Sequence, residues 1–299
     1  MAILVVGSVA LDTIQTPSCI RKNVLGGSAT YFSLAGRFFH PVRIVAVVGS
    51  DMPKNRLAFL KTKNIDLSGL EVKDGKTFRW HGKYESDMNV RNTLNLELNV
   101  FKDFIPQIPS SYADSKYVFL ANIDPCLQGN VLKRFKSLNI TALDTIDHWI
   151  KNEPDALLGL LKKTDIFFVN DYEARLFSQC SNLNLAARWI KARGPLAIVI
   201  KKGEHGVLMF YRKKFFVCPG YPIDKIVDPT GAGDAFAGGF MGYLASYGRF
   251  DDMALRQAII YGSALGSFTV EAFGIDKLIK LNKADILKRV REFKKITRF

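Results

Sequence analysis

The segment 228–236, Asp-Pro-Thr-Gly-Ala-Gly-Asp-Ala-Phe, joins a glycine loop to a carboxylate just before residues that favour a helix. Gly231 and Gly233 let a ligand approach the main chain closely. A glycine loop that opens a helix presents free N–H groups and about half a positive charge, which suits a phosphate or a transition-state oxyanion. Asp234 falls in the first helical turn, where a carboxylate can accept a proton from an attacking hydroxyl. An acidic residue there also interacts well with the helix dipole, so spacing alone leaves both interpretations open.

Further polar residues follow the short apolar runs that are typical of buried strands. They are Asp12, Gly49-Ser50-Asp51, Asn122 with Asp124, Asp144, Asn170 with Glu173, and Lys201 with Gly203. In open α/β sheets, ligands bind outside the carboxyl ends of the strands. Turns are polar in any protein, but so many polar strand ends favour a site on that edge.

The chain has the elements needed to position such a site. Apolar, β-branched runs cover residues 3–6, 44–48, 117–121, 140–143, 166–169 and 197–200. Amphipathic segments of helical length include residues 29–39, 127–138, 156–161 and 183–192, and a last one covers about 284–295. Buried strands that alternate with helices predict an α/β fold with a mainly parallel sheet.

One part of the chain breaks this alternation. In residues 76–84, Phe78, Trp80 and Tyr84 alternate with polar residues, as in a strand with one wet face. Residues 92–100 alternate similarly, and residues 13–24 are short and polar. We expect a small antiparallel sheet beside the core, either as a lid over the site or as an edge decoration.

Composition excludes several classes of protein. With 299 residues, 48% hydrophobic and 23% charged, the chain is an ordinary globular one. No apolar run is long enough to span a membrane, and the N-terminus lacks the pattern of a signal peptide, so we expect a cytoplasmic protein. The four cysteines lie far apart without metal-ligand spacing, which predicts small buried side chains rather than a zinc site or disulfides: Cys19, Cys126, Cys180 and Cys218.

The formal net charge of +14 raises the alternative of nucleic-acid binding. Many basic residues gather in the last helical segment: Lys288, Arg289, Arg291, Lys294, Lys295 and Arg298. No RNP-like aromatic cluster, zinc finger or basic-region helix accompanies them. A solvated basic face is the favoured interpretation, with no nucleic-acid and no membrane partner, and a positive field also suits an anionic substrate such as a nucleotide.

Two familiar phosphate motifs are missing. The sequence holds no GxxxxGK[ST], so it has no P-loop. Gly231-x-Gly233 continues to Phe236, where a dinucleotide fingerprint requires Gly or Ala, and it comes late in the chain.

Residues 228–240, DPTGAGDAFAGGF, closely resemble the long and specific C-terminal signature of the ribokinase-like (PfkB) carbohydrate kinases. The resemblance spans about residues 3–290. The other matching motifs are Gly26-Gly27, Gly49-Ser50-Asp51, the NxxE motif at Asn170 and Glu173, and the turn Lys201-x-Gly203-x-x-Gly206. The resemblance implies an α/β fold with a three-layer α/β/α core and a small β-sheet lid. One kinase domain would cover 1–299, with discontinuous lid segments at about 13–25 and 76–101.

The resemblance implies an ATP-dependent kinase that phosphorylates a hydroxyl of a small carbohydrate. Asp234 is then the general base, and the N–H groups of Gly231, Ala232 and Gly233 form the anion hole. The residues implied on the nucleotide side are Asn170, Glu173, Lys201, Gly203, Gly206, Thr230, Ser263 and Ser267. Those implied on the substrate side are Asp12, Gly26, Gly27, Tyr31, Asn122 and Asp144.

The same resemblance implies ATP and Mg²⁺ as cofactors, with Glu173 reaching the metal through water. It also admits a monovalent cation near Asp228 and a homodimer through the lid. The NxxE motif equally fits a helix capping box, with Asn170 as N-cap, and the two interpretations are compatible. A lid would exclude water that would otherwise hydrolyse ATP, which favours a lid over a decoration.

Departures from the family pattern concern the substrate. Ribokinases and fructokinases usually have Asn where this chain has Tyr31, and a phenol cannot copy the paired hydrogen bonds of an amide. Fructokinases tend to have an Asp-x-Asn-x-Arg run, of which Asp144 is present while Ile146 and His148 replace the others. Ribose and fructose are therefore disfavoured. The alternatives are a nucleoside kinase, with Phe78, Trp80 and Tyr31 stacking on a base, and a sugar or nucleotide sensor without turnover.

Overall fold

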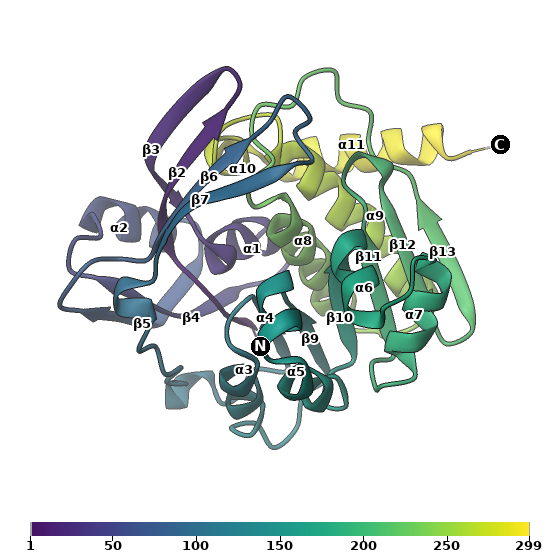
Figure 1. The fold of residues 1–299 in the computed structure, drawn as a ribbon, viewed down its shortest axis with the longest axis horizontal. Coiled ribbons are helices and arrows are strands. Elements are labelled where there is room, and N and C mark those ends of the chain that lie inside the picture. Colours follow the sequence, from purple (N-terminus) through teal and green to yellow (C-terminus); the bar gives the residue numbers. More distant parts are fainter. Residues whose placement is uncertain (1, 299) are drawn as a thin grey trace.

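The structure, a computed structural model, describes residues 2–298 and is built on a nine-stranded sheet with the order β13-β12-β11-β10-β9-β8-β1-β4-β5 (Figure 1). Its strands are β1 (Ile3–Val6), β4 (Val42–Gly49), β5 (Ile65–Lys73), β8 (Tyr117–Leu120), β9 (Ile140–Asp144), β10 (Ile166–Asn170), β11 (Ala197–Lys201), β12 (Val207–Tyr211) and β13 (Lys214–Cys218). From β11 to β5 all neighbours pair parallel, while β12 and β13 add antiparallel edge strands. The predicted α/β fold with a mainly parallel sheet is confirmed.

Helices cover both faces of this sheet, because its strands are apolar on both sides. Ile3 and Val5 of β1 enter one core and Leu4 and Val6 enter the other. The first face carries α1 (Ser28–Gly36), α2 (Lys54–Thr62), α8 (Ala232–Tyr247), α9 (Asp252–Thr269), α10 (Asp276–Lys280) and α11 (Lys283–Ile296). The second carries α3 (Pro125–Leu132), α4 (Asp147–Asn152), α5 (Pro154–Leu161), α6 (Asp171–Ser178) and α7 (Leu183–Lys191).

A separate four-stranded sheet stands over one edge of the large one (Figure 1). Its order is β3-β2-β6-β7, with β2 (Ala10–Thr16), β3 (Cys19–Gly26), β6 (Arg79–Tyr84) and β7 (Arg91–Glu97). The expected antiparallel arrangement is wrong at one pair, since β2 and β6 run parallel. The two come from distant parts of the chain, and no hairpin turn forces them to be antiparallel. We call these four strands the small sheet.

The small sheet is anchored to the core by a carboxylate at the end of β4. Asp51 accepts hydrogen bonds from the backbone and hydroxyl of Thr77, at 2.7 and 2.6 Å, and it pairs with Arg79 at 2.7 Å. The Gly49-Ser50-Asp51 motif therefore fixes the entry of the chain into β6.

Two expectations about single residues are wrong. Cys19 and Cys126 are exposed, since they lie at a hairpin turn and in the first turn of α3, and only Cys218 of the four is fully buried. In α11, Arg289 is not solvated like its basic neighbours, because it pairs with Glu271 at 2.7 Å and covers the Phe268 ring.

None of the described helices is long and apolar enough to cross a membrane.

Helix α8 approaches α1 through glycine, and this contact sets the position of the 228–234 loop. A Cβ on Gly238 would lie 2.2 Å from the carbonyl oxygen of Phe32, a backbone atom that cannot move aside. On the side of α8 that faces the sheet, Phe240 meets Phe168 edge-on, with 5.1 Å between the ring centroids.

We predict that Gly238→Ala destabilises the fold by about 1–3 kcal/mol, the usual cost of overpacking. Gly159→Ala is the matched control, because Gly159 is an exposed glycine in α5 with nothing near its Cβ position. It should gain about 0.5–1 kcal/mol from helix propensity. Urea unfolding measures both, and equal effects of the two changes would contradict the close α1–α8 contact.

Candidate active site

The glycine loop opens α8 as the sequence predicts. Gly231 is the N-cap with φ 76°, and a Cβ there would lie 2.3 Å from the ring of Tyr31, so only glycine fits. Among the described residues the N–H groups of Gly231 and Gly233 have no hydrogen-bond partner. The N–H of Ala232 differs from the expectation, since it closes a turn by donating to the carbonyl of Pro229 at 3.2 Å. The loop thus offers two free amides rather than three.

Asp234 lies in the first turn of α8, partly buried. Burial and the neighbouring carboxylate of Asp144 raise its pKa to about 7, while Lys201 and Arg91 oppose the rise. Within residues 2–298 Asp234 forms no ion pair. A carboxylate with a pKa near neutrality is well matched to accepting a proton at physiological pH.

A buried ion pair lies beside this loop. Lys201 Nζ is 2.7 Å from Asp144 Oδ2, and the two side chains are 18% and 7% exposed. Both residues end neighbouring parts of the sheet, β11 and β9, so the fold itself brings them together. Burial lowers the pKa of Lys201, but Asp144, Glu173 and Asp234 outweigh burial and the pKa is raised. The lysine therefore stays charged.

Asn170 and Glu173 form the capping box that the sequence allows. Asn170 Oδ1 accepts from the Glu173 N–H, and Glu173 Oε2 accepts from the Asn170 N–H, both at 2.7 Å. Burial is the main cause that raises the pKa of Glu173 to about 7. Lys201 lowers this pKa, and Asp144 raises it. The other oxygen of Glu173, Oε1, takes no part in this box.

Asp12 is a second buried carboxyl group of the site. It is 4% exposed, and its Oδ1 has no partner in the described chain. Burial raises its pKa to about 8 with help from Asp228 and Asp234, against hydrogen bonds from the N–H groups of Trp80 and Gly27. A Cβ on Gly26 would lie 2.0 Å from Asp12 Oδ2, so the first glycine of the pair makes room for this carboxyl group.

The aromatic residues expected to stack on a base have different positions. The Tyr31 ring is 1% exposed and lies under Gly231, which leaves only its unpaired hydroxyl to reach a ligand. Phe78 packs against Phe101, with 5.3 Å between centroids, and is half-buried. Stacking by the Tyr31 ring is therefore wrong for this conformation, because that ring is covered by protein, whereas stacking by Phe78 stays a prediction. Trp80 remains half-buried.

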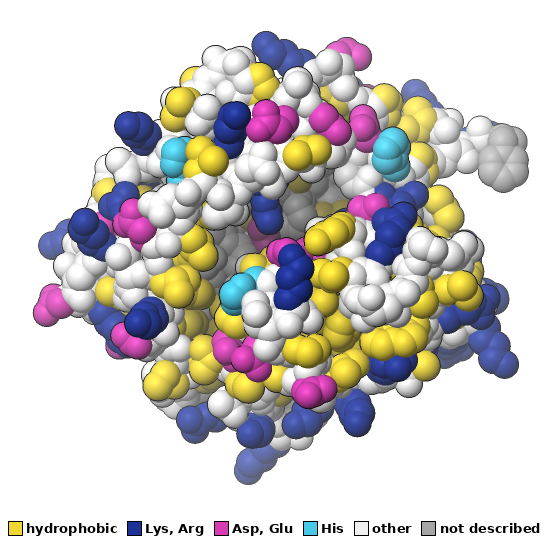
Figure 2. Space-filling view, in the orientation of Figure 1, with side chains coloured by type: hydrophobic (Ala, Val, Ile, Leu, Met, Phe, Trp, Pro, Cys, Tyr) yellow, Lys and Arg dark blue, Asp and Glu magenta, His cyan; other side chains and the backbone are white. Residues whose placement is uncertain are grey.

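The face of the small sheet turned to the core carries Trp80 and Tyr84. The Tyr84 hydroxyl is 3.1 Å from Thr230 Oγ1, so this face reaches the glycine loop. Arg91, opposite Tyr84 in the ladder, lies over the Trp80 ring at 5.5 Å. Figure 2 shows a recess between the small sheet and the core, with acidic and basic side chains inside it.

The tip of the small sheet also touches the predicted nucleotide turn. Asn89 Nδ2 donates to Glu204 Oε1 at 3.0 Å. A Cβ on Gly203, whose φ is 54°, would lie 2.7 Å from Asn89 Oδ1. Gly206 has φ 81° and packs against the carbonyl of Cys218. The small sheet is thus closed over the carboxyl ends of the strands.

Three other predicted site residues are held by protein groups. Asn122 accepts from the Trp149 indole at 2.9 Å. Ser267 donates to Ala264 and accepts from Arg289, so it faces α11, while Ser263 lies near the thiol of Cys218. Ser263 thus shares Cys218 as a neighbour with Gly206 of the nucleotide turn, and the role of either serine beside a nucleotide stays a prediction.

Some residues of the recess were missed from the sequence. Arg91 could not be found, because only the strand register places it opposite Tyr84. Gln128 of α3 is fully buried and donates to the carbonyls of Ala121 and Asp144, with its Oε1 unpaired. Tyr84 had a signal, since it shares its alternating face with Trp80.

The charges of the recess favour a bound cation. The carboxyl groups of Asp12, Glu173, Asp228 and Asp234 all have raised pKa values, chiefly through burial. Neighbouring carboxylates add to burial at Asp12, Glu173 and Asp234, and a divalent ion that arrives with a polyphosphate would relieve this repulsion between carboxylates. No group of three or more His, Cys, Asp or Glu within the described residues could hold a metal by itself. The residues therefore fit Mg²⁺ that is carried by phosphates and met by Glu173 through water.

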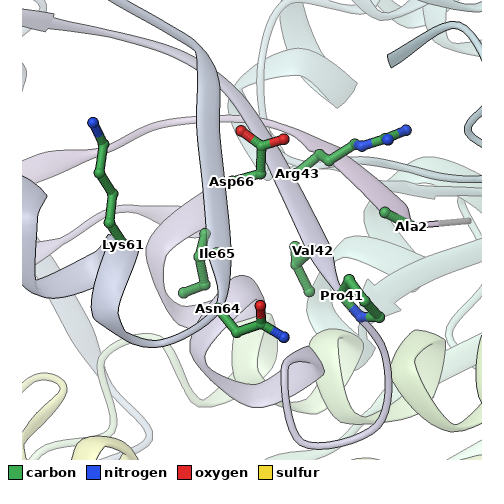
Figure 3. A pocket seen from close by; sticks show the side chains of 8 residues that line it. All are labelled: Ala2, Pro41, Val42, Arg43, Lys61, Asn64, Ile65 and Asp66. Carbon is green, nitrogen blue, oxygen red and sulfur yellow. The ribbon is translucent and has the colours of Figure 1, made fainter. Parts of the chain in front are cut away.

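Another cavity lies at the far edge of the sheet. It measures about 310 Å³ and is bordered by the first residues of β4 and β5, with Arg43, Lys61 and Asp66 around it (Figure 3). These are the amino ends of the strands, whereas the glycine loop and its charged neighbours are at the carboxyl ends. The cavity does not belong to the site.

The sequence is similar to those of kinases of one family. The pfkB family carbohydrate kinase model matches residues 2–280. A cytidine kinase of Thermococcus kodakarensis is 34% identical over 256 residues, which are 83% of this chain and 88% of that protein. A nucleoside kinase of Methanothermobacter thermautotrophicus is 27% identical and covers 91% of this chain and 90% of its own.

Solved structures share the fold. The Methanocaldococcus jannaschii nucleoside kinase has a TM-score of 0.78 at 22% identity, covering 98% of this chain and 99% of its own. A putative ribokinase II from E. coli in complex with ATP and Mg²⁺ has a TM-score of 0.80 at 19% identity, covering 97% and 99%.

We predict that Asp12→Asn stabilises the protein more at pH 9 than at pH 5. The folded state keeps a proton on Asp12 up to about pH 8, whereas the unfolded chain loses it near 3.8. Wild-type stability therefore falls as the pH rises between these values, and a pKa difference of one corresponds to about 1.4 kcal/mol. Thermal unfolding at both pH values measures the effect, with the exposed Asp155→Asn as the control. A constant difference between Asp12→Asn and wild type would contradict a raised pKa.

Proposed function

Since the chain belongs to the pfkB family of carbohydrate kinases, which transfer a phosphoryl group to a hydroxyl of a sugar or a nucleoside, we propose that its acceptor is a nucleoside. Kinases of this family use ATP as the donor. Two alternatives from the sequence, a small-sugar kinase and a nucleoside kinase, both lie within the family. The similarity to a cytidine kinase and to nucleoside kinases supports the second.

The observation that carries this proposal is the half-buried indole of Trp80 on the inner face of the small sheet. Its ring extends over Gly82, where a Cβ would lie 1.8 Å from it, and its N–H donates to Thr93 Oγ1 at 3.1 Å. The indole is therefore held in place, on the same face of the small sheet as Tyr84, whose hydroxyl reaches the glycine loop. Flat aromatic surfaces of this kind stack on nucleobases.

The sugar part of the nucleoside would be held by Asp12. Its unpaired Oδ1 can accept a hydrogen bond from a ribose hydroxyl, or donate one while protonated. The Tyr31 hydroxyl, also unpaired, adds a second polar contact from beneath the glycine loop. Gly26 and Gly27 keep the backbone close to this point.

Asp234 would act as the general base. It accepts the proton of the acceptor hydroxyl while the oxygen of that hydroxyl bonds to the γ-phosphorus of ATP. The bond from that phosphorus to the bridging oxygen breaks at the same time, and ADP leaves. The free N–H groups of Gly231 and Gly233 would donate to the oxygens of the moving phosphoryl group and stabilise its charge.

The remaining residues orient the nucleotide. Bound Mg²⁺ would neutralise the phosphates, with Glu173 positioning its water ligands from the capping box. Gly203 and Gly206 would border the adenine side, while Thr230 links the loop to the small sheet through Tyr84. The small sheet would then serve as a lid that excludes water from the phosphates.

Three earlier expectations stay predictions. A monovalent cation near Asp228 has in its favour a buried carboxylate that organises two loops, through the N–H groups of Thr230 and Gly274. A homodimer through the small sheet has in its favour the exposed apolar residues of β7, Leu94 and Leu96. One kinase domain with lid segments at about 13–25 and 76–101 is in keeping with the strands of the small sheet.

We predict that a panel of nucleosides and sugars, read by coupled ADP release, gives the highest kcat/KM with a nucleoside. Trp80→Ala should raise the nucleoside KM about tenfold or more, the usual size of a base-stacking contact, with little change in the KM for ATP. Trp80→Phe should retain most of the affinity because it keeps an aromatic face. Turnover confined to sugars, or a Trp80→Ala enzyme unchanged for nucleosides, would refute the nucleoside proposal.

We predict that Asp234→Asn lowers kcat by about 10²–10⁴-fold while ATP binding is largely retained, because the amide cannot accept the proton. Asp252→Asn is the control, since Asp252 also lies in a first helical turn but pairs with Arg256 on the surface. Steady-state kinetics and calorimetric ATP binding measure both effects. Equal activity of the two variants would exclude Asp234 as the base.

A further inference from the structure

The side chain of Lys201 extends from the end of β11 to the start of α8. A Cβ placed on Gly233 would lie 3.3 Å from Lys201 Nζ, 3.7 Å from its Cδ and 3.8 Å from its Cε. The ammonium group thus lies against the residue that contributes one of the two free amides. The cation and the free N–H group of Gly233 are therefore close neighbours at the start of α8.

In the part of the chain that the structure describes, Lys201 has one ion-pair partner, Asp144, and two further acidic neighbours. Its ammonium group binds Asp144 at 2.7 Å, and Glu173 and Asp234 act on it without forming an ion pair among the described residues. Asp144 is 7% exposed and its backbone carbonyl is bound by Gln128, so the carboxylate has a fixed position. An ammonium group has three N–H donors, and one of them is used by Asp144.

We propose that Lys201 contacts the phosphoryl group in transit between ATP and the acceptor, with Asp144 as the positioning residue that holds the ammonium group beside Gly233. The inference rests on phosphoryl transfer at this site, not on which acceptor the enzyme uses.

The role is electrostatic, and Lys201 forms no covalent bond. As the acceptor oxygen bonds to phosphorus and the bond to the leaving oxygen of ADP breaks, negative charge is spread over the three remaining phosphoryl oxygens. The proton of the acceptor goes to Asp234, and Lys201 keeps its own protons. Its second N–H donates to a phosphoryl oxygen that the two amides leave free, and the largely buried position of the lysine strengthens this interaction.

This arrangement explains why the lysine is accompanied by acids. Burial lowers the pKa of Lys201, and the carboxylates of Asp144, Glu173 and Asp234 raise it above its usual value. Asp144 keeps the lysine charged when no nucleotide is bound. When ATP binds, its γ-phosphate then meets an ammonium group that is already charged and already in place.

The test compares Lys201→Met with wild type in the full chain, and begins with binding, which needs no acceptor. With Mg²⁺ present, calorimetry should show that a non-hydrolysable ATP analogue binds Lys201→Met about tenfold or more weakly, while ADP binding changes by less than about threefold, because only the γ-phosphoryl group contacts the lysine. Lys202→Met, at the next position, is the matched control and should leave both affinities unchanged. An equal loss for the analogue and for ADP would overturn the proposal.

Kinetics with the best acceptor provide the second readout. Lys201→Met should lower kcat by about 10²–10³-fold, as loss of one transition-state donor does elsewhere. The acid limb of the pH–rate profile should move to higher pH, because Lys201 and Arg91 lower the pKa of Asp234 while Asp144 raises it. An unchanged kcat and an unmoved acid limb would contradict the proposal and would show that the Lys201–Asp144 pair has only a structural role.

A loss of stability is separated from a loss of function by the double variant Asp144→Asn with Lys201→Met. Removing both charges avoids an unpaired buried carboxylate, so this variant should fold as judged by thermal unfolding. It should still discriminate poorly between the ATP analogue and ADP. A double variant that regains wild-type preference for the analogue would contradict contact with the γ-phosphoryl group.

Discussion

The buried pair between Asp144 and Lys201 is the interaction on which the rest of the site depends. Carboxyl groups from five positions converge beneath the small sheet: Asp12, Asp144, Glu173, Asp228 and Asp234. Lys201 is the cation that the sheet itself contributes, and it pairs with Asp144 while it lowers the pKa values of Glu173 and Asp234. Four of these carboxyl groups have raised pKa values, so they bind protons more readily than exposed carboxyl groups do: Asp12, Glu173, Asp228 and Asp234. A site with this charge balance is prepared for a metal-bound polyphosphate.

The fold fixes the positions of these charged groups through the strand ends and the packing of α8. Asp144 and Lys201 end strands separated by β10, and Asn170 ends β10 itself, so the three strand ends form one row. Helix α8 is fixed against α1 and α9 through its glycines, and its first turn therefore has one position relative to that row. Tyr31 fills the space beneath Gly231, so the loop is supported from below. The positions of the proposed catalytic groups follow from the packing of the core rather than from flexible loops.

Much of this was accessible from the sequence, and the failures have physical reasons. The glycine loop, the capping box at Asn170 and the strand ends follow from local rules, and the structure has them at the expected residues. Tyr31 was expected to contact substrate through its ring, but a sequence does not show which face of a helix lies under a loop. The turn that occupies the Ala232 amide and the parallel pairing of β2 with β6 depend on tertiary contacts. Arg91 enters the recess only through strand register, for which the sequence carries no local signal.

In the proposed reaction, Asp234 takes the acceptor proton while the backbone of the glycine loop and Lys201 hold the moving phosphoryl group. A crystal structure with a nucleoside, ADP, Mg²⁺ and an aluminium fluoride mimic of the phosphoryl group would reveal both contacts at once. We expect the acceptor hydroxyl within about 2.6–3.2 Å of an Asp234 carboxylate oxygen, with the mimic bound by the Gly231 and Gly233 amides. An acceptor hydroxyl that points away from Asp234, or a mimic bound elsewhere in the recess, would contradict it.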